Sequence, residues 1–306
     1  MFALTNILNH IRKIQLNKTN LVLSIGSILV GLYLGYLIPR PNMPISQPLR
    51  LGNYKLINPL LACNDYIPVN SSPLSQMEPQ LQRIAKDLIN NQTLLRIGIY
   101  FRDLNSSTTI AINPEEEFYP ASLNKIPILI TALKMTESNL DFLSQKISTD
   151  DLKDYNQQQE IPPESFLLPD QTYTVQEALN KMIIHSDNNG FYALTKYLNL
   201  DIYHHTHNDL KIPLEPDNSS FEDYMTPEDF SYFFRVLYNA TYINYKFSEQ
   251  ALDLMTQVKY ANALRAPIPS EIPVAHKFGL LSQPNSNPPT RQLHDCGIVY
   301  YPNHPY

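Results

Sequence analysis

The chain has 306 residues, of which 17% are charged, and a formal net charge of −6. This composition argues against nucleic-acid binding, because no basic stripe is available to neutralise phosphates. The length allows one sizeable core, and 25 prolines against 8 glycines predict loops that proline stiffens.

The N-terminal part of the chain contains a long apolar run, Leu21 to Ile38, without charged residues. As a helix it would span about 27 Å, close to the hydrocarbon core of a bilayer. Basic residues lie before it, within 1–20, and only Arg40 follows closely, which predicts a cytoplasmic N-terminus and an extracytoplasmic remainder. A cleaved signal peptide is the alternative, but the run is long for one and no A-x-A site follows. We expect an uncleaved transmembrane anchor at 21–38.

The segment after this anchor, residues 39–53, is rich in proline and predicts a stiff, extended spacer. One domain is then expected over 54–306. The chain has two cysteines, Cys63 and Cys296. Outside the cytoplasm they could form one disulfide, and two buried free thiols are an equal alternative.

The first part of the domain shows a helical apolar pattern followed by a strand pattern. Apolar residues at spacings of three and four predict a helix over 75–90. A β-rich run over 94–101, a turn at Asn105 and a second run over 108–112 predict a hairpin.

Later segments predict further helices and then strands. A capping box begins at Thr174, and Pro227 follows Thr226 as a first helical residue. The expected helices are 126–135, 174 to about 185, one from 226 and one from 248, and the expected strands are 272–278 and 297–301. Strands at both ends with helices between them predict an α+β domain, with one antiparallel sheet beside a helical region.

Ser122 and Lys125 form an S-x-x-K motif at the start of an apolar helix. On a helix the two side chains lie on one face, one turn apart. A serine hydroxyl needs a base to become a nucleophile, and a lysine can be that base when burial or a nearby cation lowers its pKa. The apolar run 126–130 supplies burial, and Lys277 could supply the cation. A capping serine with a surface lysine is the alternative.

A second motif, Ser186-Asp187-Asn188, follows the helix expected to end near His185. The hydroxyl of Ser186 could relay a proton to a leaving nitrogen, and the amide of Asn188 could hold a substrate carbonyl. Serine, aspartate and asparagine all cap helices well, so an ordinary N-cap loop is the alternative.

A third motif, Lys277-Phe278-Gly279, closes a predicted strand. Gly279 would let a substrate backbone approach closely. The backbone N–H groups of Leu280 and Ser122 could together form an oxyanion hole.

In this order the three motifs resemble the S-x-x-K, S-D-N and K-T-G signature of class A β-lactamases and penicillin-recognising serine hydrolases, and the resemblance covers 54–306. It implies a β-lactamase/transpeptidase-like fold and no cofactor or metal. It also implies these roles: Ser122 as acylated nucleophile, Lys125 as general base, Ser186 as proton shuttle, Asn188 as the amide-holding residue and Lys277 as electrostatic anchor. The histidines at 204, 205 and 207 lack the spacing of a known metal site and are expected in a solvated loop.

The sequence departs from the family pattern at three places. The family's deacylating glutamate has only uncertain counterparts in Glu215 and Glu222, and without it an acyl-enzyme would clear slowly. Phe278 replaces a threonine or serine that helps bind a substrate carboxylate, and it could line an apolar subsite instead. The family continues past the final strand with another strand and a helix. We therefore expect either a fragment or another element that covers the exposed edge.

The expected function is a membrane-anchored serine hydrolase that cleaves a β-lactam or a related cell-wall peptide amide through an acyl-Ser122 intermediate. One alternative is a penicillin-binding, DD-peptidase-like enzyme that deacylates slowly. The other is a catalytically weak cell-wall-binding protein. The intact serine and lysine motifs argue against this last alternative, while Phe278 argues for it.

Overall fold

The structure, a computed structural model, describes residues 54–306 apart from 60–75, 213, 215–223 and 286–288. The chain divides into two compact units, 1–47 and 48–306, and every described residue belongs to the second. The expected anchor at 21–38 and spacer at 39–53 lie outside the described residues and stay predictions. Among the helices that are described, none has the length and apolar character needed to cross a bilayer.

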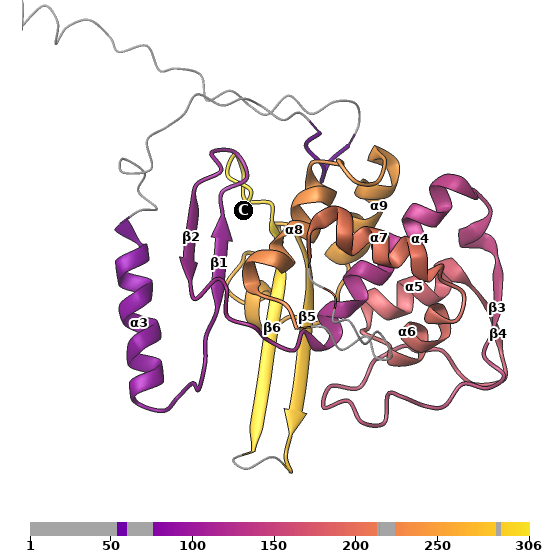
Figure 1. The fold of residues 1–306 in the computed structure, drawn as a ribbon, viewed down its shortest axis with the longest axis horizontal. Coiled ribbons are helices and arrows are strands. Elements are labelled where there is room, and N and C mark those ends of the chain that lie inside the picture. Colours follow the sequence, from indigo (N-terminus) through magenta and orange to yellow (C-terminus); the bar gives the residue numbers. More distant parts are fainter. Residues whose placement is uncertain (1–53, 60–75, 213, 215–223, 286–288) are drawn as a thin grey trace, which may run out of the picture. The chain divides into compact units, whose positions relative to one another are not determined.

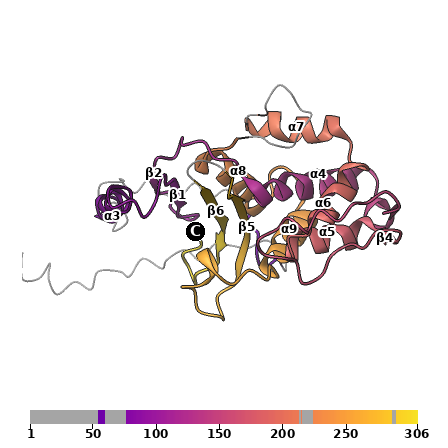
Figure 2. The same cartoon turned by 90° about the horizontal axis from the view of Figure 1, so that it is seen from below.

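Two hairpins and a helical region organise the described part of the chain. Figures 1 and 2 both place α4, α5, α6 and α9 on one side of the β5–β6 hairpin, and α3 with β1 and β2 on the other. In chain order the elements are α3 (Glu78–Asn90), β1 (Ile99–Arg102), β2 (Thr109–Ile112), η3 (Ala121–Asn124), α4 (Lys125–Ser138), η4 (Phe142–Ser144), β3 (Lys146–Ser148), β4 (Thr172–Thr174), α5 (Val175–Ile184), α6 (Asn188–Thr195), α7 (Leu200–Leu210), α8 (Pro227–Tyr238), α9 (Tyr245–Thr256), η5 (Ala263–Arg265), β5 (Val274–Gln283) and β6 (Thr290–Val299).

The described strands form three separate two-stranded antiparallel sheets, β1–β2, β3–β4 and β5–β6. The α+β class is therefore confirmed, but the expectation of one antiparallel sheet is wrong for this part of the chain. The last residues join β1–β2 to β5–β6 in place of a strand ladder. Leu104 N donates to Pro305 O at 2.9 Å, and Val299 N donates to Tyr306 O at 2.8 Å.

The β5–β6 hairpin is longer than predicted. Its register runs from Val274 opposite Val299 to Gln283 opposite Thr290, whereas the sequence predicted strands over 272–278 and 297–301. Polar residues around the hairpin's far end hide the two-residue alternation there, so the pattern ended too early. The third motif consequently lies within β5 and not at its end.

Helix starts follow their capping side chains. The Thr174 side chain accepts from Glu177 N, and the Glu177 carboxylate accepts from Thr174 N, which confirms the capping box of α5. Thr226 caps α8 as expected. The start expected at Ser248 is wrong, because Asn244 caps α9 through Phe247 N at 3.0 Å. A helix start at asparagine needs no proline or glutamate signal.

The first hairpin is shorter than its pattern. Residues 94–98 are not a strand, because Thr93 N and Leu94 N still donate to Leu88 O and complete the end of α3. The predicted helix over 75–90 is confirmed from Glu78 onward. The turn at Asn105 is also confirmed, since Asp103 Oδ1 accepts from Asn105 N at 3.0 Å.

Helix α4 is the centre of the core. Its residues 125–133 are all buried, and Ile126, Ile128 and Ile130 are fully buried. A helical segment that is buried on every side has neighbours all round. The predicted helix over 126–135 is thus confirmed, and it carries Lys125 as its first residue.

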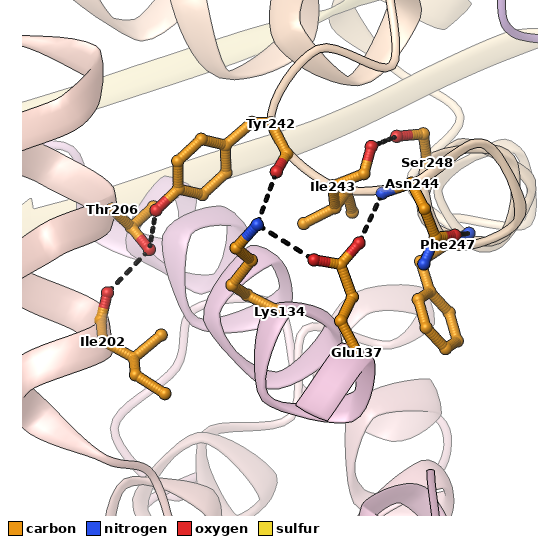
Figure 3. A network of polar contacts seen from close by, with 9 residues as sticks. All are labelled: Lys134, Glu137, Ile202, Thr206, Tyr242, Ile243, Asn244, Phe247 and Ser248. Carbon is orange, nitrogen blue, oxygen red and sulfur yellow. Dashed lines mark hydrogen bonds and ion pairs between the residues drawn. The ribbon is translucent and has the colours of Figure 1, made fainter. Parts of the chain in front are cut away.

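Polar contacts fix the far end of α4 (Figure 3). Lys134 Nζ lies 2.9 Å from Glu137 Oε2 and donates to Tyr242 O at 2.9 Å. Glu137 Oε1 accepts from Asn244 N at 2.6 Å, and Tyr242 donates to Thr206 Oγ1 at 3.2 Å. These contacts connect the C-terminal end of α4 to the start of α9 and, through Tyr242, to α7.

The three histidines belong to α7, and the expectation of a solvated loop is wrong. His207 is fully buried and packs against the rings of Tyr203 and Phe233. The helical pattern of α7 was missed because its buried face consists of Tyr203, Thr206 and His207, which are not the aliphatic residues that mark a buried helix face. Burial, followed by the nearby His204, lowers the pKa of His207 to about 4.

Candidate active site

Ser122 lies in the tight turn η3, directly before α4. Ala121 has φ 51°, a left-handed conformation that is strained for a residue with a side chain. Gly279 of β5 packs against this turn. A Cβ at Gly279 would lie 2.6 Å from Pro120 O and 3.3 Å from Ser122 N. Only glycine therefore allows β5 to approach the serine this closely.

Lys125 Nζ is within hydrogen-bond distance of oxygens from three residues. It lies 2.9 Å from Ser122 Oγ, 2.8 Å from Ser186 O and 2.7 Å from Asn188 Oδ1. The carbonyl of Ser186 and the amide oxygen of Asn188 can only accept, so the amine donates to both. A neutral amine then has its lone pair left for the Ser122 hydroxyl. The arrangement can take a proton from Ser122.

Burial decides the protonation of Lys125. The residue is 2% exposed. This burial lowers the pKa of Lys125 to about 7, against the opposing pull of the Asp187 carboxylate. A substantial share of the amine is therefore neutral near pH 7, as a general base requires.

Ser186 lies between the two buried lysines. Its Oγ is 3.2 Å from Lys125 Nζ and 2.9 Å from Lys277 Nζ. Ser186 itself has φ 60°, a second strained residue at this place. Burial, and then the charge of Lys125, lower the pKa of Lys277 well below its ordinary value. The hydroxyl can pass protons between the groups around it.

Asp187 organises the second motif from within. It is fully buried, and its Oδ1 accepts from Asn156 Nδ2 at 2.8 Å and from Asn189 N at 2.9 Å. Its Oδ2 accepts from Leu167 N at 2.9 Å and from Gly190 N at 3.0 Å. The helix-cap alternative is thus correct for Asp187, while Ser186 and Asn188 on either side of it contact Lys125.

The loop before β4 adds residues that the sequence did not indicate. Asn156 Oδ1 accepts from Asn188 N at 2.8 Å. Gln159 Nε2 donates to Ser186 O at 3.3 Å, and Tyr155 O accepts from Asn188 Nδ2 at 3.2 Å. An irregular segment has no periodicity, so nothing in the pattern marked these residues.

Phe278 and Tyr260 form an aromatic stack beside Lys277. Their ring centroids are 4.1 Å apart with an interplanar angle of 22°. Lys277 Nζ lies 4.2 Å from the centroid of Phe278 and donates to Phe278 O at 3.0 Å. Tyr260 was missed because it lies between two elements, outside any motif.

Some predicted site residues stay untested. Glu215 and Glu222 lie outside the described residues, as does Cys63. Cys296 lies within β6 and has no disulfide partner among the described residues. Burial raises the pKa of Cys296 to about 12, so this thiol is a poor nucleophile at neutral pH.

The fold and the motif geometry agree with a comparison to known families. The profile described as the β-lactamase enzyme family matches residues 79–306. The chain belongs to this family. A comparison with curated proteins found no match.

Solved structures similar to this β-lactamase family member share its fold. A mutant of PBP-A, described as an acyl-enzyme complex with penicillin G, has a TM-score of 0.60 at 20% identity, over 76% of this chain and 85% of that one. A variant of the TLA-1 extended-spectrum β-lactamase has a TM-score of 0.62 at 15% identity, over 74% and 87%. A β-lactamase from Chitinophaga pinensis has a TM-score of 0.60 at 18% identity, over 74% and 87%.

Proposed function

We propose that this protein is a serine hydrolase that forms an acyl-enzyme on Ser122 from a β-lactam or a related cell-wall peptide amide. The observation that carries the proposal is the environment of Lys125. Its amine is buried, lies 2.9 Å from Ser122 Oγ, and has Ser186 O and Asn188 Oδ1 as acceptors for its own protons. A surface lysine beside a capping serine would have none of these features.

Acylation begins at Ser122. Neutral Lys125 takes the hydroxyl proton while Oγ attacks the carbonyl carbon of the substrate. As the C–N bond breaks, Ser186 gives its proton to the leaving nitrogen and regains one from Lys125. Each proton therefore has a donor and an acceptor among residues within hydrogen-bond distance.

Charge on the substrate oxygen needs donors as the tetrahedral intermediate forms. We assign this role to the backbone N–H groups of Ser122 and Leu280. Gly279 supports the assignment, because it allows β5 to lie against Ser122 N. Asn188 would hold a substrate amide, and Lys277 would keep the local potential positive around Ser186.

Water must then attack the acyl-ester carbon and release Ser122. Family membership and the likeness to β-lactamase structures support β-lactam hydrolysis. In that case we assign Glu215 as the base that activates the water, with Glu222 as the alternative. The likeness to PBP-A, described in a penicillin G acyl-enzyme complex, supports the slower, penicillin-binding alternative. The lifetime of the adduct separates the two.

The experiment uses the full-length protein with benzylpenicillin and with its methyl ester, and follows intact mass and reagent consumption over time. A lasting adduct that Ser122→Ala abolishes indicates a penicillin-binding site, whereas consumption without an accumulated adduct indicates a β-lactamase. In the second case Glu215→Gln should trap the adduct. A folded protein that neither bonds to nor consumes any of these compounds would contradict the proposal and favour a wall-binding protein.

We further propose that the protein is anchored in the membrane by residues 21–38, with the hydrolase domain outside the cytoplasm. The uncharged apolar run and the basic residues before it support this. Alkaline extraction of membranes tests the anchor, and a reporter fused after residue 306 tests the orientation. Release of the intact protein by alkali would contradict it.

A further inference from the structure

The aromatic stack occupies the wall of the site where the third motif departs from its family pattern. Phe278 is 6% exposed. Its ring stacks on Tyr260 and also lies against the amine of Lys277. Tyr260 is only half-buried, so it is the member of the stack that faces outward. A partly exposed aromatic ring, backed by a second ring, therefore lies beside the third motif.

The stack also encloses Lys277, which is fully buried. Its amine donates to Ser186 Oγ at 2.9 Å and to Phe278 O at 3.0 Å, and the Phe278 ring lies against it at 4.2 Å. These contacts occupy the ammonium group from several directions. It is not open to a second anion that arrives from solvent.

Two carboxylates, Asp295 and Glu160, lie near the stack in addition to the amine of Lys277. Asp295 lies opposite Phe278 on β6, and its carboxylate is held by His276 Nδ1 at 2.9 Å and by Leu264 N at 3.1 Å. The Arg291 side chain bonds to the Glu160 carboxylate, with Nε at 3.2 Å from Oε2.

The same charges affect the pKa of the Tyr260 hydroxyl. Burial raises the pKa of Tyr260; Asp295 and Glu160 raise it further, and Arg291 opposes them. Arg291, the cation that opposes them, is already paired with the Glu160 carboxylate.

We propose that the Tyr260–Phe278 stack determines specificity and selects acyl substrates that carry a neutral, apolar group in place of a carboxylate beside the scissile bond. This rests on the proposed function. A carboxylate at this wall would lose hydration beside Asp295, and the buried amine of Lys277 already donates to Ser186 Oγ and Phe278 O. An apolar or aromatic group would instead stack on Tyr260, an interaction that aromatic pairs favour.

The chemical step is the same for both kinds of substrate. Ser122 Oγ bonds to the carbonyl carbon, the C–N bond breaks, and the nitrogen takes a proton through Ser186. Benzylpenicillin and its methyl ester share this reacting ring and differ only in the charge of the neighbouring group. The pair therefore isolates the interaction with the stack.

The test measures the second-order rate constant of Ser122 acylation by both compounds, each divided by its rate with hydroxide. We expect the ester to react at least about tenfold faster with the unmodified protein, which corresponds to about 1.4 kcal/mol. An acid that reacts as fast as the ester, or faster, overturns the inference while leaving the proposed function intact. If neither compound acylates folded protein, both fail.

Variants locate the preference. Phe278→Thr should reduce the ester preference about tenfold, because it removes the stack and adds a hydroxyl donor. Phe278→Leu is the matched control, since it stays apolar and should keep most of the preference. Tyr260→Ser should weaken it as well. Equal preferences in Phe278→Thr and in the unmodified protein, with melting temperatures alike, would contradict the assignment.

Discussion

The two buried lysines that reach Ser186 have different surroundings. Lys125 is met by oxygens that accept its protons, and it lies 2.9 Å from the serine hydroxyl. Lys277 donates to Ser186 Oγ and to the carbonyl oxygen of Phe278, and it also lies against the Phe278 ring. The first lies at the start of a core helix and the second in a hairpin strand. We therefore expect the helical side to hold the reactive groups and the hairpin side to control what can approach them.

The largest expected effect comes from removing the base. Lys125→Ala should lower the acylation rate constant by about 10²–10⁴, the usual contribution of general base catalysis. It should leave the fold intact, because the change removes a charge that is costly to bury. Intact mass with time gives the rate. Exposed Lys153→Ala is the control and should react like the unmodified protein. Unchanged acylation in Lys125→Ala would rule out this base.

The pH dependence should follow the same amine. Because burial lowers the pKa of Lys125 to about 7, the neutral form is present above this pH and is lost as the pH falls. The acylation rate should rise with pH to a plateau above about 8, and fall about tenfold for each unit well below the midpoint. A rate profile measured from pH 5 to 9 tests this. A flat profile over that range would assign proton removal to another group.

A smaller effect is expected where the two sides meet. Gly279→Ala would place a Cβ 2.6 Å from Pro120 O, so β5 must move away from η3. Acylation should fall about tenfold and the free energy of unfolding by about 1–3 kcal/mol, the usual cost of overpacking. Denaturant unfolding and acylation rates measure the two. Gln283→Ala, at the exposed end of β5, should change neither. Normal rates in Gly279→Ala would mean that the close approach is dispensable.

The smallest effect is expected at the surface of the hairpin side. Glu160 bonds to Ser282 and Arg291, all of them exposed. Exposed ion pairs contribute little and are screened by salt. Glu160→Gln should therefore change acylation by the neutral ester less than about twofold, at low and high salt alike. A much larger change would show that this contact, and not the aromatic stack, governs entry.

The sequence motifs predicted the site residues better than the strand patterns predicted the sheet arrangement. The three-residue spacing of the serine and lysine predicted that they face each other, and Lys125 reaches Ser122 although Ser122 lies in η3 and not in the helix itself. Helix caps such as Thr174 are local and could be predicted. Tyr260 and Asn156 come from irregular segments, where no period exists to be recognised. The division of the strands into three separate two-stranded sheets was not predicted, because the last residues contact Leu104 in place of a direct ladder.

Asp187 has a consequence for how the site opens. Its carboxylate binds Asn156 and Leu167 from the long loop and Asn189 and Gly190 from α6. If the loop left alone, it would expose this buried charge with half of its partners gone. The loop and the start of α6 should therefore open as one cooperative unit in hydrogen exchange. The loop and the start of α6, which together surround Lys125, are then either both folded or both open, so a partly assembled site does not accumulate.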